Sequence, residues 1–62
     1  MKLLITKINN SNAIDELAKQ FYCKAEKQKG KIIITKNSQL SENEFSALAG
    51  KLVLKGFNVE LF

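Results

Sequence analysis

Residues 12–36, NAIDELAKQFYCKAEKQKGKIIITK, join the clearest helical pattern of the chain to its most apolar segment. At about 100° per residue, the apolar side chains of the first half fall on one stripe and polar side chains fall opposite. These apolar residues are Ile14, Leu17, Ala18, Phe21 and Ala25. Lysines then precede Gly30, and glycine commonly ends a helix in the left-handed conformation. The pattern predicts a helix over residues 12–28 and a strand over residues 31–36.

The segments on either side continue this alternation of strand and helix. Residues 2–8 are apolar and rich in β-branched side chains, which favours a strand, and the polar residues 9–12 that follow favour a turn. Residues 41–55 begin with a capping box, Ser-x-x-Glu, and are followed directly by a glycine, which predicts a second helix. The strict alternation of residues 57–61 predicts a final strand with one face in water.

Strands and helices that alternate with short connections are typical of parallel strands joined by right-handed crossovers. We therefore expect an α/β fold, a single small βαβαβ domain over residues 1–62 with a three-stranded, mainly parallel sheet. With strand order 1-2-3, both helices pack on one face of the sheet, which is the arrangement that we favour for so short a chain. Strand order 2-1-3 would put the helices on opposite faces, and it stays open at this point.

Composition limits the chemistry of the chain. Its 62 residues include ten lysines, no arginine, six acidic residues, no histidine and a single cysteine, Cys23. One cysteine cannot form an internal disulfide, and without histidine we expect no conventional metal site. The longest apolar runs are far shorter than the about 20 residues of a membrane-spanning helix. We expect a cytoplasmic domain without metal, cofactor or membrane contact, and the abundance of lysine, asparagine and isoleucine suggests a bacterial or phage genome.

Catalysis is not expected from this set of residues. Four of the six acidic residues fall in the first turns of the predicted helices, where negative charge is stabilising. They are Asp15, Glu16, Glu42 and Glu44. Cys23 has no histidine to activate it, and a two-layer domain of this size has little room for a substrate pocket. We predict a non-enzymatic protein with no catalytic residues.

Apolar side chains also fall on the sheet face turned away from the predicted helices. They are Leu4, Ile8, Ile33 and Phe62. Because parallel sheets are normally covered on both faces, we expect a second copy of the chain or another protein to cover this one. A second stripe on the 41–55 helix, which includes Gly50 and Leu54, either packs against the first helix or joins the interface. Our hypothesis is a small interaction module, a regulator or inhibitor that binds a protein partner and forms a homodimer.

The net charge of +4 is concentrated near the end of the first predicted helix. The basic residues of this stretch are Lys19, Lys24, Lys27, Lys29 and Lys31. Such a patch can bind the phosphates of a nucleic acid or an acidic protein surface, although lysines at a helix end also need no partner. Arginine, which is preferred for bidentate contacts to phosphates and bases, is absent. Nucleic-acid binding through residues 19–31 is therefore the alternative function, and a protein is the favoured partner.

Overall fold

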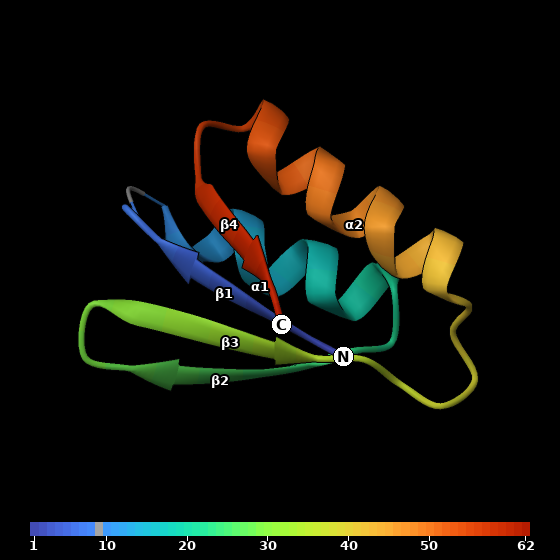
Figure 1. Ribbon diagram of the computed structural model, residues 1–62. Coiled ribbons are helices and arrows are strands. Elements are labelled where there is room, and N and C mark those ends of the chain that lie inside the picture. The colour runs from blue at the N-terminus through green and yellow to red at the C-terminus, as the bar shows by residue number, and fades with distance from the viewer. Residues whose placement is uncertain (9) are drawn as a thin grey trace.

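The computed structural model describes residues 1–8 and 10–62; Asn9, in the predicted 9–12 turn, lies outside the described residues. The described residues form two helices and four strands (Figure 1). In chain order these are β1 (Lys2–Thr6), α1 (Ser11–Gln20), β2 (Lys24–Gln28), β3 (Lys31–Thr35), α2 (Glu42–Leu54) and β4 (Asn58–Leu61).

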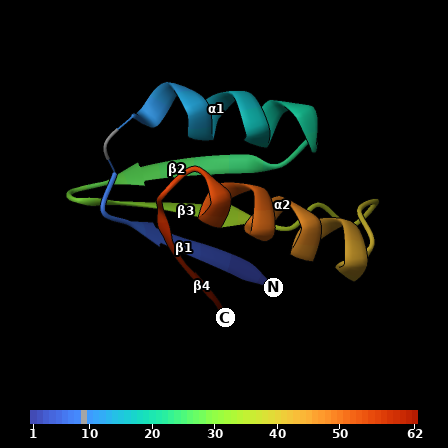
Figure 2. The same ribbon diagram turned by 90° about the horizontal axis from the view of Figure 1, so that it is seen from above.

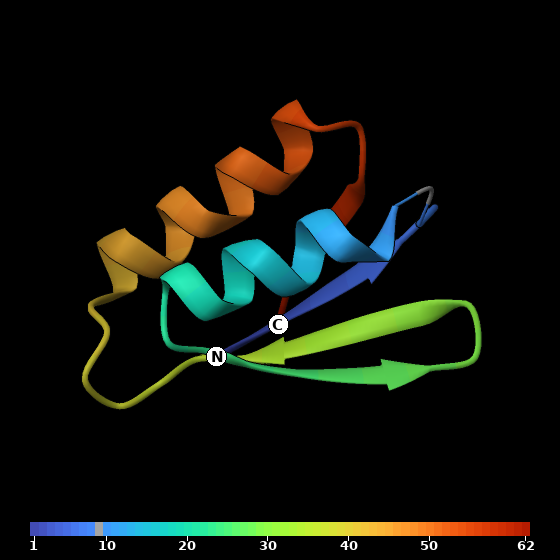
Figure 3. The same ribbon diagram turned by 180° about the vertical axis from the view of Figure 1, so that it is seen from behind.

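The four strands form one sheet in the order β2-β3-β1-β4, and every neighbouring pair is antiparallel. Both helices lie on the same face of this sheet, as the views from above (Figure 2) and from behind (Figure 3) show. Helix α1 connects β1 to β2, and β3 occupies the place between these two strands. This βαββαβ arrangement is the split βαβ, or ferredoxin-like, topology.

The expected three-stranded, mainly parallel βαβαβ sheet is wrong. Residues 24–28, predicted as the last turns of the first helix, form strand β2, which adds a fourth strand. Because a tight hairpin joins β2 to β3, the latter runs opposite to the expected direction and pairs with β1 in antiparallel orientation. One misassigned segment therefore changes the number, the order and the direction of the strands.

The first helix ends early because the backbone of Tyr22 is left-handed, with a φ of 55°. The N–H of Cys23 donates to the Ala18 carbonyl (2.8 Å). The N–H of Tyr22 donates to the Lys19 carbonyl (3.1 Å), which completes a Schellman motif with tyrosine at the position that glycine usually occupies. The side-chain amide of Asn37 donates to the Tyr22 carbonyl (2.9 Å) and fixes the turn from a distant part of the chain.

The hairpin between β2 and β3 has a two-residue loop, Lys29 and Gly30. Gln28 pairs with Lys31 across this loop, and Gly30 has a φ of 75°. Glycine adopts a positive φ at little steric cost, so Gly30 forms a hairpin turn and not a helix end. The same residue suits both roles, which is why its presence alone does not distinguish a helix from a hairpin.

The core lies between the sheet and the two helices. Leu3 and Ile5 of β1 are fully buried, as is Ile34 of β3, and Ile32 is 2% exposed. The helices and loops complete the core with apolar residues only, among the described positions. They are Ile14, Leu17, Ala18, Leu40, Phe45, Leu48, Leu52 and Phe57. Alternate residues of the two central strands thus anchor both helices to one face of the sheet.

Helix α2 confirms the second predicted helix and both of its ends. The Ser41 hydroxyl accepts from the N–H of Glu44 (3.1 Å), and the Glu44 carboxylate accepts from the N–H of Ser41 (3.3 Å). At the other end, Gly56 has a φ of 94°, and the N–H of Phe57 donates to the Leu52 carbonyl (3.3 Å). Phe57 thereby folds back into the core.

Replacing Tyr22 with glycine is expected to stabilise the fold. A non-glycine residue in the left-handed conformation costs about 1–2 kcal/mol, and the glycine variant avoids this cost. Part of the resulting gain in stability is lost because glycine raises the entropy of the unfolded chain. The Tyr22 side chain is 80% exposed, so its removal costs little packing. Urea or thermal unfolding should show Tyr22→Gly to be more stable by about 0.5–1 kcal/mol. Tyr22→Ala removes the same ring but keeps the backbone strain, and an equal gain from this control would contradict the explanation.

Candidate functional site

Among the described residues, both helices lie on one side of the sheet and leave its other face open (Figure 1). Leu4 of β1 and Ile33 of β3 are paired directly across the two central strands, and both are half-buried. Because successive strand residues point to opposite faces, these side chains point away from the core residues Leu3 and Ile34. Phe62, directly after β4, is 60% exposed at the same face. We call this surface, centred on Leu4 and Ile33, the open face.

A row of four paired residues crosses the open face. Glu26 of β2 pairs with Ile33, Ile33 pairs with Leu4, and Leu4 pairs with Glu60 of β4. Directly opposed side chains in a sheet have their Cβ atoms about 5 Å apart, so the four side chains form a continuous row. The apolar pair therefore lies between two carboxylates, one at each edge of the sheet.

Lysines lie on the open face at both ends of the central strands. Lys2 begins β1 and exchanges two backbone hydrogen bonds with Phe62 (2.6 and 2.8 Å), which places Phe62 on this face. Lys31 begins β3 and, because β3 is antiparallel to β1, lies at the other end. Lys24 of the edge strand β2 points to the same face. The open face is thus a surface of mixed charge around an apolar centre.

Leu4, Ile33 and Phe62 are the apolar residues predicted on this face that the structure brings together. Ile8 is not with them, because it follows the end of β1 and packs against the core. We expected a cover on this face because parallel sheets are normally covered on both faces. This reason does not apply, since the sheet is antiparallel and an antiparallel sheet commonly has one face in water. Support for an interface must come from the residues of the open face themselves.

Gly50 and Leu54 belong to α2 and lie on the helix side of the molecule, not on the open face. Leu54 is 88% exposed and lines, with Ala13 and Leu17 of α1, a groove of about 520 Å³ between the two helices. A Cβ atom at Gly50 would meet nothing within 4 Å, so the expected close packing against the first helix does not explain this glycine. The residues predicted at one interface are therefore divided between two surfaces.

Alanine at position 50 is expected to stabilise α2. Glycine inside a helix costs about 1 kcal/mol relative to alanine, and the added methyl group of Gly50→Ala has open space around it. Chemical unfolding should show a gain of about 0.5–1 kcal/mol. Gly56→Ala is the matched control, and it should destabilise because position 56 has a φ of 94°. A Gly50→Ala protein without any gain would mean that the methyl group meets an obstacle at this position.

The five lysines predicted as one basic helix end are spread over several elements. They are Lys19 in α1, Lys24 and Lys27 in β2, Lys29 in the hairpin loop and Lys31 at the start of β3. The predicted helix end does not exist, because α1 stops before residue 24. Strand β2 is at the edge of the sheet, and lysines on an edge strand oppose unwanted pairing with other chains. Part of the basic segment therefore has a structural explanation.

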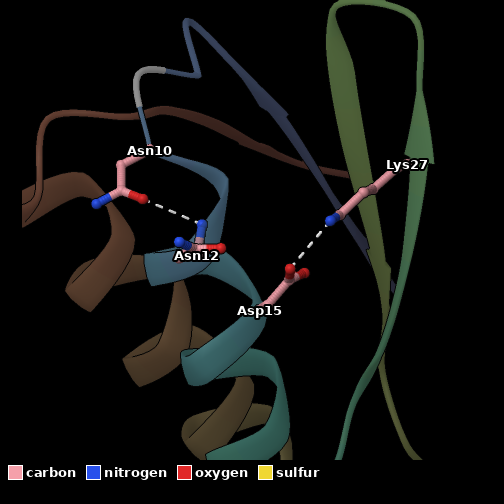
Figure 4. A network of polar contacts seen from close by, with 4 residues as sticks. All are labelled: Asn10, Asn12, Asp15 and Lys27. Carbon is pink, nitrogen blue, oxygen red and sulfur yellow. Dashed lines mark hydrogen bonds and ion pairs between the residues drawn. The ribbon is translucent and has the colours of Figure 1, made fainter.

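Lys27 forms an ion pair within the chain, on the helix side of the sheet. Its Nζ lies 3.0 Å from Oδ2 of Asp15 in α1, and the two side chains are 57% and 39% exposed (Figure 4). Beside this pair, Oδ1 of Asn10 accepts from the N–H of Asn12 (3.1 Å) and caps the start of α1. An ion pair this exposed contributes at most about 1 kcal/mol. It joins α1 to the edge strand and leaves Lys27 outside the open face.

Side chains with catalytic or metal-binding potential are dispersed over the described surface. Residues 1–8 and 10–62 contain no group of three or more His, Cys, Asp or Glu side chains placed to hold a metal ion. Cys23 is half-buried, and its thiol donates to the Phe21 carbonyl (3.4 Å). A second hollow, of about 250 Å³, lies beside Tyr22 and Asn37. In the part of the chain that the structure describes, no helix has the length and apolar character needed to cross a membrane.

Glu26 and Glu60 belong to the open face, although no sequence motif marks them. Glu26 falls within the predicted first helix, and only the register of β2 against β3 places it beside Ile33. Residues 24–28, KAEKQ, show no alternation of apolar and polar side chains, so the strand has no signal of its own; Lys29 and Gly30 directly before an apolar strand are compatible with a two-residue hairpin loop as well as with a helix end.

Comparison of the chain with protein-family models, curated proteins and solved structures found no match. The ferredoxin-like topology hosts many unrelated functions, so the fold alone assigns none. A functional proposal must therefore be argued from the surface, and the open face offers the most specific arrangement of side chains.

Proposed function

We propose that this protein is a non-enzymatic interaction module that binds a protein partner through the open face of its sheet. The observation that supports this most is the Leu4–Ile33 pair at the centre of the sheet face turned away from both described helices (Figure 1), with Phe62 exposed beside it. The pair lies on the two central strands, each of which is hydrogen-bonded to a neighbouring strand on both sides. An apolar centre with a polar rim is the usual composition of a protein-binding surface.

A contact function also agrees with the structural roles of the chain's reactive side chains. Glu44 caps α2, Asp15 pairs with Lys27, and the thiol of Cys23 is bonded to a backbone carbonyl. We infer that the protein acts by covering a surface of its partner, as a small regulator or inhibitor does. In this proposal it acts in the cytoplasm of a bacterial or phage-infected cell, and it associates with itself.

Nucleic-acid binding through residues 19–31 has less support. The lysines of that segment do not share one surface, and Lys27 is held in an ion pair. Proteins that bind RNA on a four-stranded sheet stack its bases on aromatic side chains of the central strands, whereas Leu4 and Ile33 occupy the centre here. The open face therefore favours a protein as the partner.

An acidic residue at the centre of the open face is expected to abolish partner binding. Ile33→Asp places a charge where the partner's apolar surface would bury it, and an unpaired buried charge is strongly unfavourable. Tagged wild-type protein should capture a partner from extracts of its native cells that Ile33→Asp captures at least about tenfold less. Leu54→Asp, the same kind of change at an 88%-exposed residue of α2, is the matched control and should capture as much as the wild type.

Circular dichroism and thermal unfolding must first show that both variants are folded. Equal capture by the wild type and by Ile33→Asp would contradict the proposal. Capture that survives Ile33→Asp, falls steeply with salt and is lost on combined Lys19→Glu and Lys29→Glu substitution would instead support the nucleic-acid alternative, because these two lysines lie outside the open face.

A further inference from the structure

We propose that the partner of the open face is a second copy of this chain, stacked face to face with its strands crossing at a steep angle. The inference rests on the proposed function and adds the identity of the partner and the arrangement of the two sheets. Lys24 lies at a corner of the open face, away from the apolar centre, and four other charged residues nearer to that centre support the inference. They are Glu26, Glu60, Lys2 and Lys31.

The two acids and the two lysines lie on lines of equal length that cross at the apolar centre. Glu26 and Glu60 are three strand spacings apart along one row, which is about 14 Å. Lys2 and Lys31 are one strand spacing apart across the sheet and four residues apart along the strands. The diagonal between them is therefore also about 14 Å. Each lysine precedes its apolar neighbour on the same strand by two residues, so both lines have their midpoint in the apolar pair.

Two copies stacked face to face can be related by a two-fold axis that lies between the sheets and bisects the angle between the acidic line and the lysine line. Rotation about this axis places the acidic line of one copy over the lysine line of the other. The angle can be bisected in two ways, so there are two possible axes. Each carboxylate of one copy then lies over a lysine of the other, and the apolar pairs of both copies meet at the centre. One axis pairs Glu26 with Lys2 and Glu60 with Lys31 of the second copy, and the other axis exchanges these partners. The same patch is used by both copies, as in the isologous contacts of most homodimers.

The charges disfavour the alternative way of stacking the two sheets. If the strands of the two copies were aligned, Glu26 would face either Glu26 or Glu60 of the second copy, and like charges would meet at both edges. In the proposed stack, the strands of the two copies cross at roughly 70°, an angle that follows from the same strand and residue spacings. This steep crossing belongs to the orthogonal class of sheet packing. The charge pattern therefore favours one of the two common classes of sheet-on-sheet packing.

Association through the sheet edges is also disfavoured. Strand β2 has Lys24 and Lys27 on its edge, and edge lysines oppose pairing with another chain. In β4, antiparallel pairing of Val59 with Leu61 of the second copy would place two Glu60 side chains opposite each other. Stacking through the open face avoids both problems.

The dimer is expected to be weak. The chain measures 28 × 21 × 21 Å, so one face offers at most about 600 Å² and two faces bury about 1,200 Å². This area is at the lower end of the range for specific protein interfaces. Association should therefore be sought at protein concentrations of roughly 100 µM and above.

Charge swaps that keep the net charge at +4 test the arrangement. One variant combines Glu26→Lys with Lys2→Glu, and the other combines Glu26→Lys with Lys31→Glu. For either axis, one variant keeps every acid over a lysine and the other brings like charges together. Sedimentation velocity in low salt should show that the wild type and one variant dimerise to a similar extent, while the other variant associates at least about tenfold more weakly.

Exchange of all four charges inverts the pattern and should restore dimerisation, which also shows that the substituted surface is compatible with folding. In an aligned stack with Glu26 over Glu60 of the second copy, Glu26→Lys would replace a repulsive contact with an attractive one. If both double variants dimerise better than the wild type, the sheets are stacked in this aligned way and the inference is overturned. A wild type that stays monomeric at roughly 1 mM would also overturn it. If that monomer still captures another protein through Ile33, only the second copy is refuted as the partner, and the proposed function stands.

Discussion

The left-handed backbone at Tyr22 sets the length of α1, and the rest of the sheet depends on that length. Ten helical residues span about 15 Å, close to the about 17 Å of a five-residue strand, so α1 returns the chain to the end of the sheet where β1 began. The chain can then enter β2 parallel to β1, with space between them that β3 fills through a two-residue hairpin. A helix through residue 28 would be about 25 Å long and would overshoot the strands.

The sequence signals at the two ends of α2 predicted this helix correctly, because only one local structure satisfies each of them. The capping box at Ser41 and the glycine at position 56 fix both ends of α2 whatever the rest of the chain does. Residues 24–28 are different, because lysine, alanine, glutamate and glutamine are good helix formers and Ala25 continues the apolar stripe of α1. Their strand conformation comes from pairing with β3, and strand preference depends strongly on such neighbours. This part of the fold could not be predicted from local pattern alone.

The same distinction applies to the open face. Alternation along each strand places Leu4 and Ile33 on the face opposite the core residues in any sheet, parallel or antiparallel, so their position on the open face could be predicted. Which residues lie beside them depends on strand order and register. The positions of Glu26 and Glu60 at the two edges therefore follow only once β2 exists and β4 pairs with β1. A charge pattern spread over four strands is a property of the sheet and has no counterpart in any one segment.

Strand preference does not account for this charge pattern. Isoleucine and threonine suit an antiparallel sheet with one face in water, and Ile33 alone would need no partner. Glutamate is a poor strand former, yet Glu26 and Glu60 lie at both ends of the row that contains the apolar pair. Charges that only kept the face hydrated could take any arrangement. Two acids and two lysines on equal lines that cross at one apolar centre meet a stricter condition, because a two-fold contact needs each of these four charges to lie over its opposite when the face is turned onto itself. Lys24, at a corner of the face, lies outside this pattern.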